Sequence, residues 1–272
     1  MSESHLAFVG IAPHPPVMVP EVGGEMALEV RASIEAMRDL TERVKACGAE
    51  TVALISPHAP LEERAFVAYD GPLLRGDFAN FRAPQATVEA PLDVELLEAI
   101  EESAAREGYS VVRLRPRELD HGTAVPLYFL LRGGWQGRVV ALGYSFLSNE
   151  DHVRFGRSVS RAVEKVGRPV AFIASGDLSH RLTPGAPAGF HPEARRFDEE
   201  VVEAIRERMP ERVVNIDQGL RRLAGECGYR SMLVAFGVCA DAAPDFEVLH
   251  YEAPFGVGYL VAQLARANLS EP

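Results

Sequence analysis

The sequence is poor in cysteine and has no long apolar segment. Its three cysteines, Cys47, Cys227 and Cys239, form no Cys-x-x-Cys pair. This sparse, odd number argues against a disulfide framework or a thiolate zinc knuckle, and it is typical of a reducing compartment. No apolar run approaches the roughly 18 residues that a membrane span needs, and residues 1–5 lack the charged-then-apolar pattern of a secretory signal. We therefore expect a cytoplasmic protein without a membrane partner.

Basic residues are also in short supply. Lys and Arg number 28 against 39 Asp and Glu, which gives a net charge of −11. Nucleic-acid binding depends on cationic side chains that neutralise phosphates, so this composition disfavours nucleic acid as a partner. The same charge disfavours adhesion to an anionic membrane surface. Hydrophobic residues make up 47% of the chain, which is enough for a sizeable buried core.

Short apolar runs alternate with stretches of helical periodicity along the whole chain. Strands are expected at residues 6–11, 51–55, 111–114, 139–144, 169–175 and 247–252. Helices are expected at residues 24–46, 93–107, 124–131, 150–166, 192–208, 218–224 and 230–238. Residues 61–91 are rich in proline, with hairpin strands expected at 64–69 and 87–90, and residues 257–267 fit either a strand or a helix. The alternation predicts a single α/β domain over residues 1–272, with a central, mostly parallel sheet flanked by helices.

Four of the eight histidines follow predicted strands. His14, His58 and His180 each come soon after a strand, and His121 follows another strand through a longer link. Because the C-terminal ends of strands in an open α/β sheet share a crevice where ligands bind, we expect these imidazoles to lie close together. A lone histidine after a strand is more often a solvated loop residue, so the argument depends on several occurring together.

The loops that carry His14 and His58 resemble each other and are rich in proline. The first reads Ala-Pro-His-Pro-Pro and the second Ser-Pro-His-Ala-Pro. Proline fixes its own φ and biases the preceding residue toward extended geometry, so such a loop presents an imidazole with little loss of freedom. Metal ligands benefit from that rigidity. The pattern therefore indicates a metal site at strand C-terminal ends. The other histidines lack this context: we expect His5 and His152 to face solvent, and we keep His191 and His250 as weak candidates.

Five segments carry a resemblance to a known family. They are Gly10-Ile-Ala-Pro-His-Pro-Pro, Ile55-Ser-Pro-His-Ala-Pro, Leu119-Asp-His-Gly-Thr-Ala-Val-Pro-Leu, Ser175-Gly-Asp-Leu-Ser-His and Gly225-Glu-Cys-Gly. In this order and spacing they resemble the class III extradiol ring-cleavage dioxygenases of the LigB-type superfamily, and within it the proteins grouped near the Memo-like relatives. The resemblance extends over essentially the whole chain. The third and fourth segments are its most specific parts.

The resemblance implies a non-heme iron(II) centre held by two histidines and one carboxylate, which leaves one face of the metal open. By motif position, the ligands would be His14, His58 and Glu226. The same mapping makes His180 the acid–base residue and His121 a second active-site histidine near the substrate. Histidine suits proton transfer because its ordinary pKa lies near neutrality.

The third ligand is the position with most alternatives. Glu226 precedes an expected helix and has an alternative role in stabilising the N-terminus of that helix. Memo-like relatives carry a cysteine at or beside the glutamate position, so Cys227 is a secondary candidate, as is the carboxylate of Glu252. Cysteine is also a common small buried hydrophobe. For Asp177 we expect a local turn or a hydrogen bond to a ligating histidine.

Three functions compete at this stage. The first is an iron(II) extradiol dioxygenase that takes O2 and a catecholic or aminophenolic substrate. The second is a Memo-like metal-binding accessory protein without dioxygenase turnover, holding zinc or copper. The third is a zinc hydrolase on the same scaffold, which ranks last because no separate base–nucleophile pair is evident. The family resemblance also suggests a homo-oligomer, and a small second subunit is a further possible partner.

Overall fold

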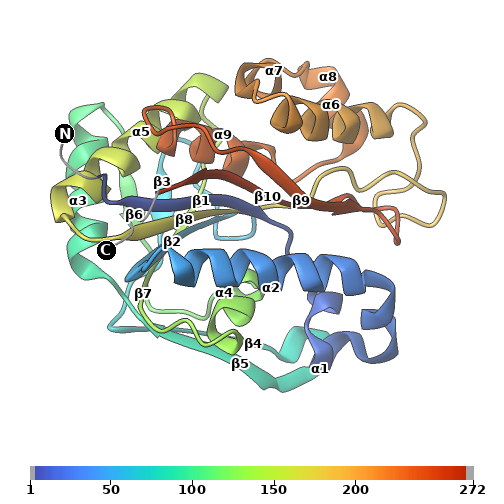
Figure 1. Ribbon diagram of the computed structural model, residues 1–272, viewed down its shortest axis with the longest axis horizontal. Helices are drawn as coiled ribbons and strands as arrows, with labels where there is room; N and C mark the ends of the chain where they lie inside the picture. The colour runs from blue at the N-terminus through green and yellow to red at the C-terminus, as the bar shows by residue number, and fades with distance from the viewer. Residues whose placement is uncertain (1–3, 268–272) are drawn as a thin grey trace.

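An eight-stranded sheet runs through the centre of the molecule (Figure 1). The computed structural model describes residues 4–267. Along the sheet the strands follow the order β6 (Val111–Arg113), β3 (Phe66–Ala68), β7 (Arg138–Gly143), β2 (Thr51–Ser56), β8 (Val170–Ser175), β1 (Leu6–Ala12), β10 (Tyr259–Arg266) and β9 (Glu247–Glu252). The expected α/β fold with a mostly parallel sheet is therefore confirmed.

The four central strands are parallel to one another. β7 pairs with β2, β2 with β8, and β8 with β1, all in parallel register. β10 lies antiparallel to β1 on one side, and β3 lies antiparallel to β7 on the other. Because β2, β8 and β1 are neighbours that point the same way, the loops that follow them emerge side by side at one edge of the sheet.

Helices cover both faces of the sheet (Figure 1). One face carries α2 (Arg31–Ala46) and α4 (His121–Arg132), with the short α1 (Pro20–Gly23) and the separate hairpin of β4 (Leu73–Phe78) and β5 (Ala83–Pro91) beyond them. The other face carries α9 (Tyr229–Val238) and α5 (Asn149–Val166), flanked by α3 (Val94–Arg106). The remaining helices, α6 (Ala194–Arg206), α7 (Pro210–Val214) and α8 (Gln218–Ala224), extend this second layer.

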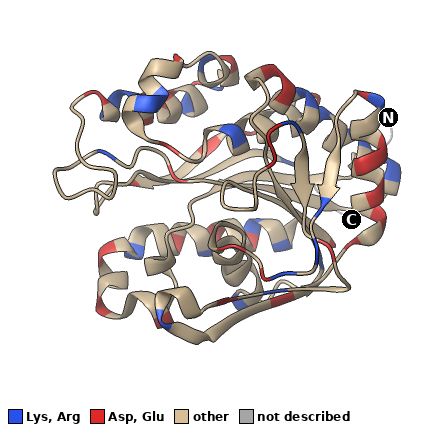
Figure 2. Ribbon diagram, turned by 180° about the vertical axis from the view of Figure 1, so that it is seen from behind, with Lys and Arg blue, Asp and Glu red and all other residues tan. Residues whose placement is uncertain are grey.

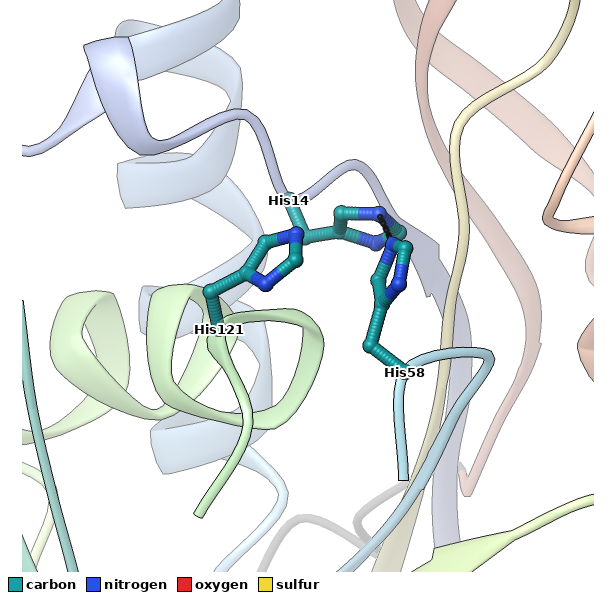
Figure 3. A group of neighbouring side chains, drawn as sticks. All are labelled: His14, His58 and His121. Carbon is teal, nitrogen blue, oxygen red and sulfur yellow. Dashed lines mark hydrogen bonds between the residues drawn. The ribbon is translucent and has the colours of Figure 1, made fainter. Parts of the chain in front are cut away.

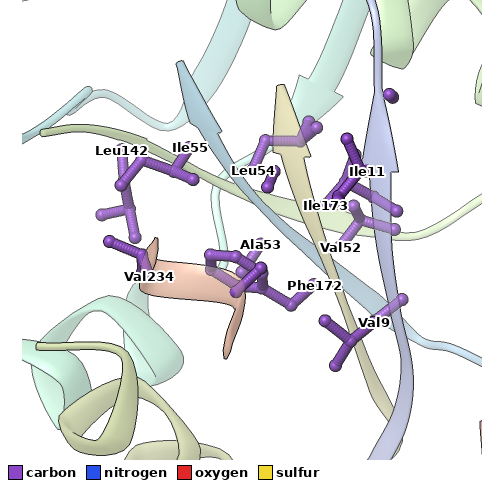
Figure 4. Packing of buried hydrophobic residues seen from close by; sticks show 14 of the residues in the cluster. Val9, Ile11, Val52, Ala53, Leu54, Ile55, Leu142, Phe172, Ile173 and Val234 are labelled. Atoms are coloured by element: carbon purple, nitrogen blue, oxygen red, sulfur yellow. The ribbon is translucent and has the colours of Figure 1, made fainter. Parts of the chain in front are cut away.

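The central strands are apolar along their whole length because helices cover them on both sides. Every residue of β1, β2 and β8 is buried. Figure 4 shows Ile55, Leu142 and Val234 packed together, so that side chains from two strands meet one from α9. This tight core fixes the strand ends, and with them the loops that carry the histidines.

The structure corrects several details of the expected elements. Residues 64–69 and 87–90 do not form a hairpin with each other: β3 joins the main sheet, while β5 pairs with β4, a strand the sequence pattern did not reveal. Residues 24–30 are 3₁₀-helix, so the α-helix begins only at Arg31. Residues 257–267, which fitted either element, contain the strand β10.

Charged residues lie mainly on the outer helices and loops, with both signs interspersed (Figure 2). Within residues 4–267, no helix is both long and apolar enough to cross a membrane.

Candidate metal centre

Three neighbouring strand ends bring the candidate ligands together. His14 lies two residues after β1, His58 two residues after β2, and Asp177 two residues after β8. His121 is the first residue of α4, and it reaches the same place from the helical layer that contains α2 and α4. The cluster therefore joins segments that are far apart along the chain.

The imidazoles of His14, His58 and His121 form a compact group (Figure 3). The Nε2 atoms of His14 and His58 are 3.0 Å apart. The ring centroids of His58 and His121 are 4.1 Å apart and stacked, and those of His14 and His121 are 5.5 Å apart. Two ring nitrogens that face each other at this distance suit a shared hydrogen bond or a common cation.

The hydrogen bonds of His14 fix which ring nitrogen carries its proton. The Ser175 hydroxyl donates to the Gly122 carbonyl oxygen at 2.5 Å, so its oxygen is left to accept from His14 Nδ1, which lies 2.9 Å away. With the proton on Nδ1, the lone pair of Nε2 points toward His58. An imidazole whose far nitrogen donates to a protein acceptor is the usual arrangement of a metal ligand.

Desolvation within the cluster favours the neutral form of these imidazoles. It lowers the pKa of His14 well below its ordinary value, and the neighbouring His58, His121 and His180 lower it further. Burial also lowers the pKa of His58 to about 4, with a further contribution from His121, while the nearby Asp120 opposes the shift. The pKa of His121 is lowered for the same reason. Neutral imidazoles are the form that binds a metal cation.

A second group of potential ligands shares His14. Its members are His14, Asp177 and Cys227. The Nε2 atom of His14 lies 3.7 Å from Asp177 Oδ2 and 3.7 Å from Cys227 Sγ. Asp177 also accepts a hydrogen bond from the backbone N–H of His14 at 3.0 Å. This hydrogen bond ties Asp177 to the His14 loop, and the group places a carboxylate and a thiol beside the imidazole pair.

Asp120, which lies in the third of the five motif segments but was given no role there, stabilises the cluster through hydrogen bonds. Its carboxylate accepts hydrogen bonds from Ser56 Oγ at 2.5 Å, from Tyr69 Oη at 2.8 Å and from the backbone N–H of Thr123 at 3.0 Å. Ser56 Oγ in turn accepts from the backbone N–H of His58 at 3.1 Å. One carboxylate therefore caps α4 and ties the His58 loop to it.

The glycine after His121 is required by this close packing. A Cβ atom on Gly122 would overlap Ser56 Oγ and would lie 3.2 Å from Cδ2 of His58. The Gly122 carbonyl oxygen is also the acceptor that orients Ser175 toward His14. The first turn of α4 thus contacts the supports of both central imidazoles.

The structure brings His180 near the cluster. Its ring lowers the pKa of His14, and its own pKa is lowered by burial, which outweighs the opposing effect of hydrogen bonds to the backbone of Gly225 and Leu178. Its Nδ1 atom is buried and has no hydrogen-bond partner within residues 4–267.

Glu226 and Glu252 lie outside both ligand groups. Glu226 Oε2 accepts a hydrogen bond from the backbone N–H of Tyr229 at 2.8 Å, which is the alternative role considered for it at the start of a helix. Glu252 Oε1 accepts from Ser33 N at 3.0 Å and from Ser33 Oγ at 2.5 Å. Its other oxygen lies 3.5 Å from His250.

His152 was expected to face solvent, and that expectation is wrong. It is fully buried on α5, where its Nδ1 lies 2.7 Å from the Ser148 carbonyl oxygen and its Nε2 lies 3.2 Å from that of Ser145. The error arose because the residue lies on the inward face of a polar helix turn. Both ring nitrogens of His152 lie at hydrogen-bond distance from backbone carbonyl oxygens, and the residue does not belong to either ligand group.

The fold and this cluster define a class of α/β proteins with a histidine-rich site at the ends of parallel strands. Residues 9–262 match the family model described as the catalytic LigB subunit of aromatic ring-opening dioxygenase. Because the match covers most of the sequence, the chain belongs to the LigB family.

Two curated relatives and one solved structure are similar to this chain. The chain is 34% identical to Protein CA_C1420 of Clostridium acetobutylicum over 264 residues, covering 93% of this chain and 56% of that protein. It is 26% identical over 192 residues to 2,3-dihydroxyphenylpropionate/2,3-dihydroxicinnamic acid 1,2-dioxygenase of Escherichia coli (strain 55989 / EAEC), covering 65% of this chain and 55% of that protein. The chain thus spans about half the length of the curated relatives it matches.

The similarity to the solved structure concerns the fold. The uncharacterized protein JW3007 from Escherichia coli K12 superimposes with a TM-score of 0.63 at 16% identity, over 95% of this chain and 100% of that one. The family supports the use of a metal and a relationship to ring-opening dioxygenases.

Proposed function

We propose that this protein is an iron(II)-dependent extradiol dioxygenase that opens a catecholic or aminophenolic ring with O2. The observation that carries the proposal is the facing pair of neutral imidazoles, His14 and His58, with Nε2 atoms 3.0 Å apart. The chain belongs to the LigB family, and these are the two histidines that the resemblance to that family implies as metal ligands.

The donor set fits a divalent metal. His14 and His58 would hold it, and Asp177 is the carboxylate nearest to them, with Oδ2 3.7 Å from His14 Nε2. Glu226, the carboxylate implied by the family resemblance, is engaged with the N-terminus of α9 through one oxygen. We therefore propose Asp177 as the third ligand before Glu226. When bound, iron(II) with two histidines and one carboxylate supplies open positions for substrate and O2.

The protein's own side chains would manage the proton of the substrate hydroxyl. His180, whose buried Nδ1 has no hydrogen-bond partner among residues 4–267, is the residue that we propose to accept that proton. His121 stacks on His58, and its ring lies edge-on to that of Phe81 with 5.4 Å between the centroids. It therefore lines the site on the side of Phe81. It would hydrogen-bond the substrate there. Association with a second copy or with a small second subunit remains part of this proposal.

An oxygen-uptake screen tests the proposal. Protein purified without oxygen and loaded with iron(II) should consume O2 with at least one catechol or aminophenol and form a yellow ring-opened product. Alanine at His14 or His58 should remove both metal and activity, whereas His180→Gln should keep the metal and lose most turnover. Oxygen uptake that persists in the His14→Ala protein would contradict the proposal.

A Memo-like accessory protein is the second candidate, and Cys227 favours it. The thiol sulfur lies 3.7 Å from His14 Nε2, on the same side as Asp177. A thiolate is a soft ligand that suits zinc or copper better than an oxygen-activating iron centre. This candidate predicts tight binding of zinc, loss of that binding in Cys227→Ser, and no turnover on any catechol. The first candidate predicts that Cys227→Ser retains iron.

A further inference from the structure

Asp198 is a buried carboxylate that belongs to neither ligand group. It lies on α6, the helix that packs against α8 and β9 (Figure 1), and its side chain is fully buried. Within residues 4–267 it forms no ion pair. Its Oδ2 atom accepts a hydrogen bond from Tyr251 Oη at 2.7 Å, and its Oδ1 atom accepts one from the backbone N–H of Ser179 at 2.9 Å. One carboxylate therefore links α6 and β9 to the residue directly before His180.

The segment that carries His180 is irregular, so hydrogen bonds fix its position. Residues 176–193 connect β8 to α6 without a helix or strand. Ser179 Oγ and the backbone N–H of His180 both donate to the Ala224 carbonyl oxygen at 3.0 Å, and the Ser179 carbonyl oxygen accepts from Gly258 N at 2.8 Å. Ala224 and Gly258 act through their backbones. Asp198 is therefore the partner of Ser179 that a substitution can remove.

Close packing leaves the carboxylate of Asp198 little room to move. A Cβ atom on Gly258 would overlap Asp198 Oδ2 and would lie 2.9 Å from Leu178 Cβ. The Gly258 carbonyl oxygen accepts from the backbone N–H of Leu178 at 2.8 Å, and the Gly258 N–H donates to Ser179. The carboxylate therefore lies directly against the backbone that pairs with the His180 segment.

The imidazole of His180 depends on the same backbone. Hydrogen bonds to the backbone of Gly225 and Leu178 raise the pKa of His180, against the larger effect of burial. Leu178 is bonded to Gly258, and Gly225 directly follows the residue that accepts from His180 N. A displacement of Ser179 would therefore move the ring relative to its own contacts.

Stability does not account for an acid at this place. Burial raises the pKa of Asp198 to about 7, although the hydrogen bonds from Tyr251 and Ser179 oppose the shift. A buried carboxylate without an ion pair costs free energy, and an apolar side chain of the same shape would avoid that cost. What the carboxylate adds is an oxygen atom that accepts the Ser179 N–H.

We infer that Asp198 is a positioning residue, which fixes the segment before His180 and, through it, the imidazole. The inference rests on the proposed function, in which His180 accepts a proton from the substrate. Asp198 acts through Ser179 and contacts neither the ligand groups nor the imidazole itself.

The first part of the same segment is anchored separately. Gly176 N donates to the Ala12 carbonyl oxygen at 3.0 Å, and Asp177 accepts from the backbone N–H of His14. These contacts tie Asp177 to the end of β1. Loss of the Asp198 contact should therefore displace His180 while the metal stays bound.

The test compares Asp198→Leu with Asp198→Asn, two uncharged side chains of nearly the same shape. Asparagine keeps an oxygen that can accept from Ser179 N, and leucine does not. In iron-loaded protein, Asp198→Leu should lower kcat for O2 uptake with a catechol by about 10- to 100-fold, the effect of a small displacement of a reacting group. Asp198→Asn should recover most of this loss. Iron content and the KM for the catechol should stay unchanged in both variants.

A second readout follows His180 without turnover. Histidine isotopically labelled at Cε1 gives a separate NMR signal for each ring in zinc-loaded protein, and His180→Gln identifies the signal of His180. That signal should shift in Asp198→Leu and stay near its wild-type position in Asp198→Asn. Tyr251→Phe is the matched control, because it removes the hydrogen bond to the other carboxylate oxygen. It should change neither kcat nor the signal.

Circular dichroism establishes that each variant is folded, and Asp198→Ala replaces the leucine variant if that protein does not fold. An unshifted His180 signal, equal effects of leucine and asparagine, or a shift with normal kcat in an active enzyme overturns the inference and leaves the proposed dioxygenase intact. The expected shift in a protein that takes up no O2 with any catechol supports the placement of His180 by Asp198 and contradicts the proposed dioxygenase.

Discussion

Asp120 holds three separate segments together with a single carboxylate. It accepts hydrogen bonds from Ser56 and Tyr69, and it caps α4 through Thr123. Replacing it with alanine should lower metal affinity by about 10- to 100-fold, because residues that orient ligands typically contribute this much. Loss of the cap should also cost roughly 1 kcal/mol of stability. Competitive metal titration and chemical unfolding measure the two effects separately.

Asp217 offers a matched control for Asp120. It caps α8 by accepting a hydrogen bond from Leu220 N at 3.1 Å, away from the histidines. Asp217→Ala should show a similar loss of stability with unchanged metal affinity. If the two variants bind metal equally well, Asp120 is only a helix cap.

The histidines were predictable from sequence and Asp120 was not, for a physical reason. His14 and His58 each follow a strand within two residues, so a local pattern places them at the sheet edge. The role of Asp120 depends on Tyr69, which is 51 positions away and whose strand was assigned the wrong partner. Pairing between distant segments leaves no periodic signal in the sequence.

The buried His152 predicts a pH dependence of stability. Burial lowers its pKa to about 4, below the ordinary value of 6.5. Below pH 6.5 the unfolded chain binds a proton that the folded protein does not, so this residue makes the fold less stable as pH falls toward 4. The gap corresponds to on the order of 3 kcal/mol. His152→Asn should reduce the loss of stability between pH 6.5 and 4.5 in urea unfolding.

His191→Asn serves as the control for that measurement, because His191 lies in the loop before α6 and is only half-buried. This variant makes the same histidine-to-asparagine change outside the protein interior, so it separates the effect of the buried site from that of the substitution itself. An identical pH slope for wild type and His152→Asn would show that His152 does not stay neutral in the folded protein.

At the scale of elements, α5 and α9 cross at two glycines. A Cβ atom on Gly156 would overlap the Val234 carbonyl oxygen and lie 2.8 Å from Gly237 Cα. Both obstacles are backbone atoms, which cannot turn aside, so Gly156→Ala forces the helices apart. We expect a loss of about 1–3 kcal/mol, the usual cost of overpacking. Chemical unfolding of the metal-free protein measures it.

Gly185 provides the comparison for this substitution. A Cβ atom there meets nothing within 4 Å. Gly185→Ala should leave stability unchanged or raise it slightly by restricting the unfolded chain. Equal stability of the two alanine variants would mean that α5 and α9 tolerate a wider separation.

The helices and the buried central strands were predictable because their periodicity is local. α3, expected at residues 93–107, begins at Val94, and Asp93 caps it by accepting a hydrogen bond from Leu96 N at 3.0 Å. The sequence pattern did not predict β4, because Arg75 and Gly76 interrupt its apolar alternation. It also did not predict that β3 pairs with β7. Strand pairing is decided by contacts across the fold and not by neighbours along the chain.

At the scale of the whole molecule, the parallel order of β2, β8 and β1 creates the site. The loops after these strands carry His58, Asp177 and His14. His121, at the start of α4, adds a ligand candidate from one helical layer, and Cys227, just before α9, adds one from the other. A metal that binds this folded arrangement and not the unfolded chain should raise the unfolding temperature, and the rise should grow with its affinity.

The most direct test of the account is the metal content of protein purified without oxygen and loaded with iron(II). The wild type should retain about one ion per chain after gel filtration, and His14→Ala and His58→Ala should each retain almost none. His250→Ala, whose imidazole lies beside Glu252 and outside both ligand groups, should match the wild type. Retention of the same amount of metal by His14→Ala and His58→Ala would contradict a centre shared by these two imidazoles.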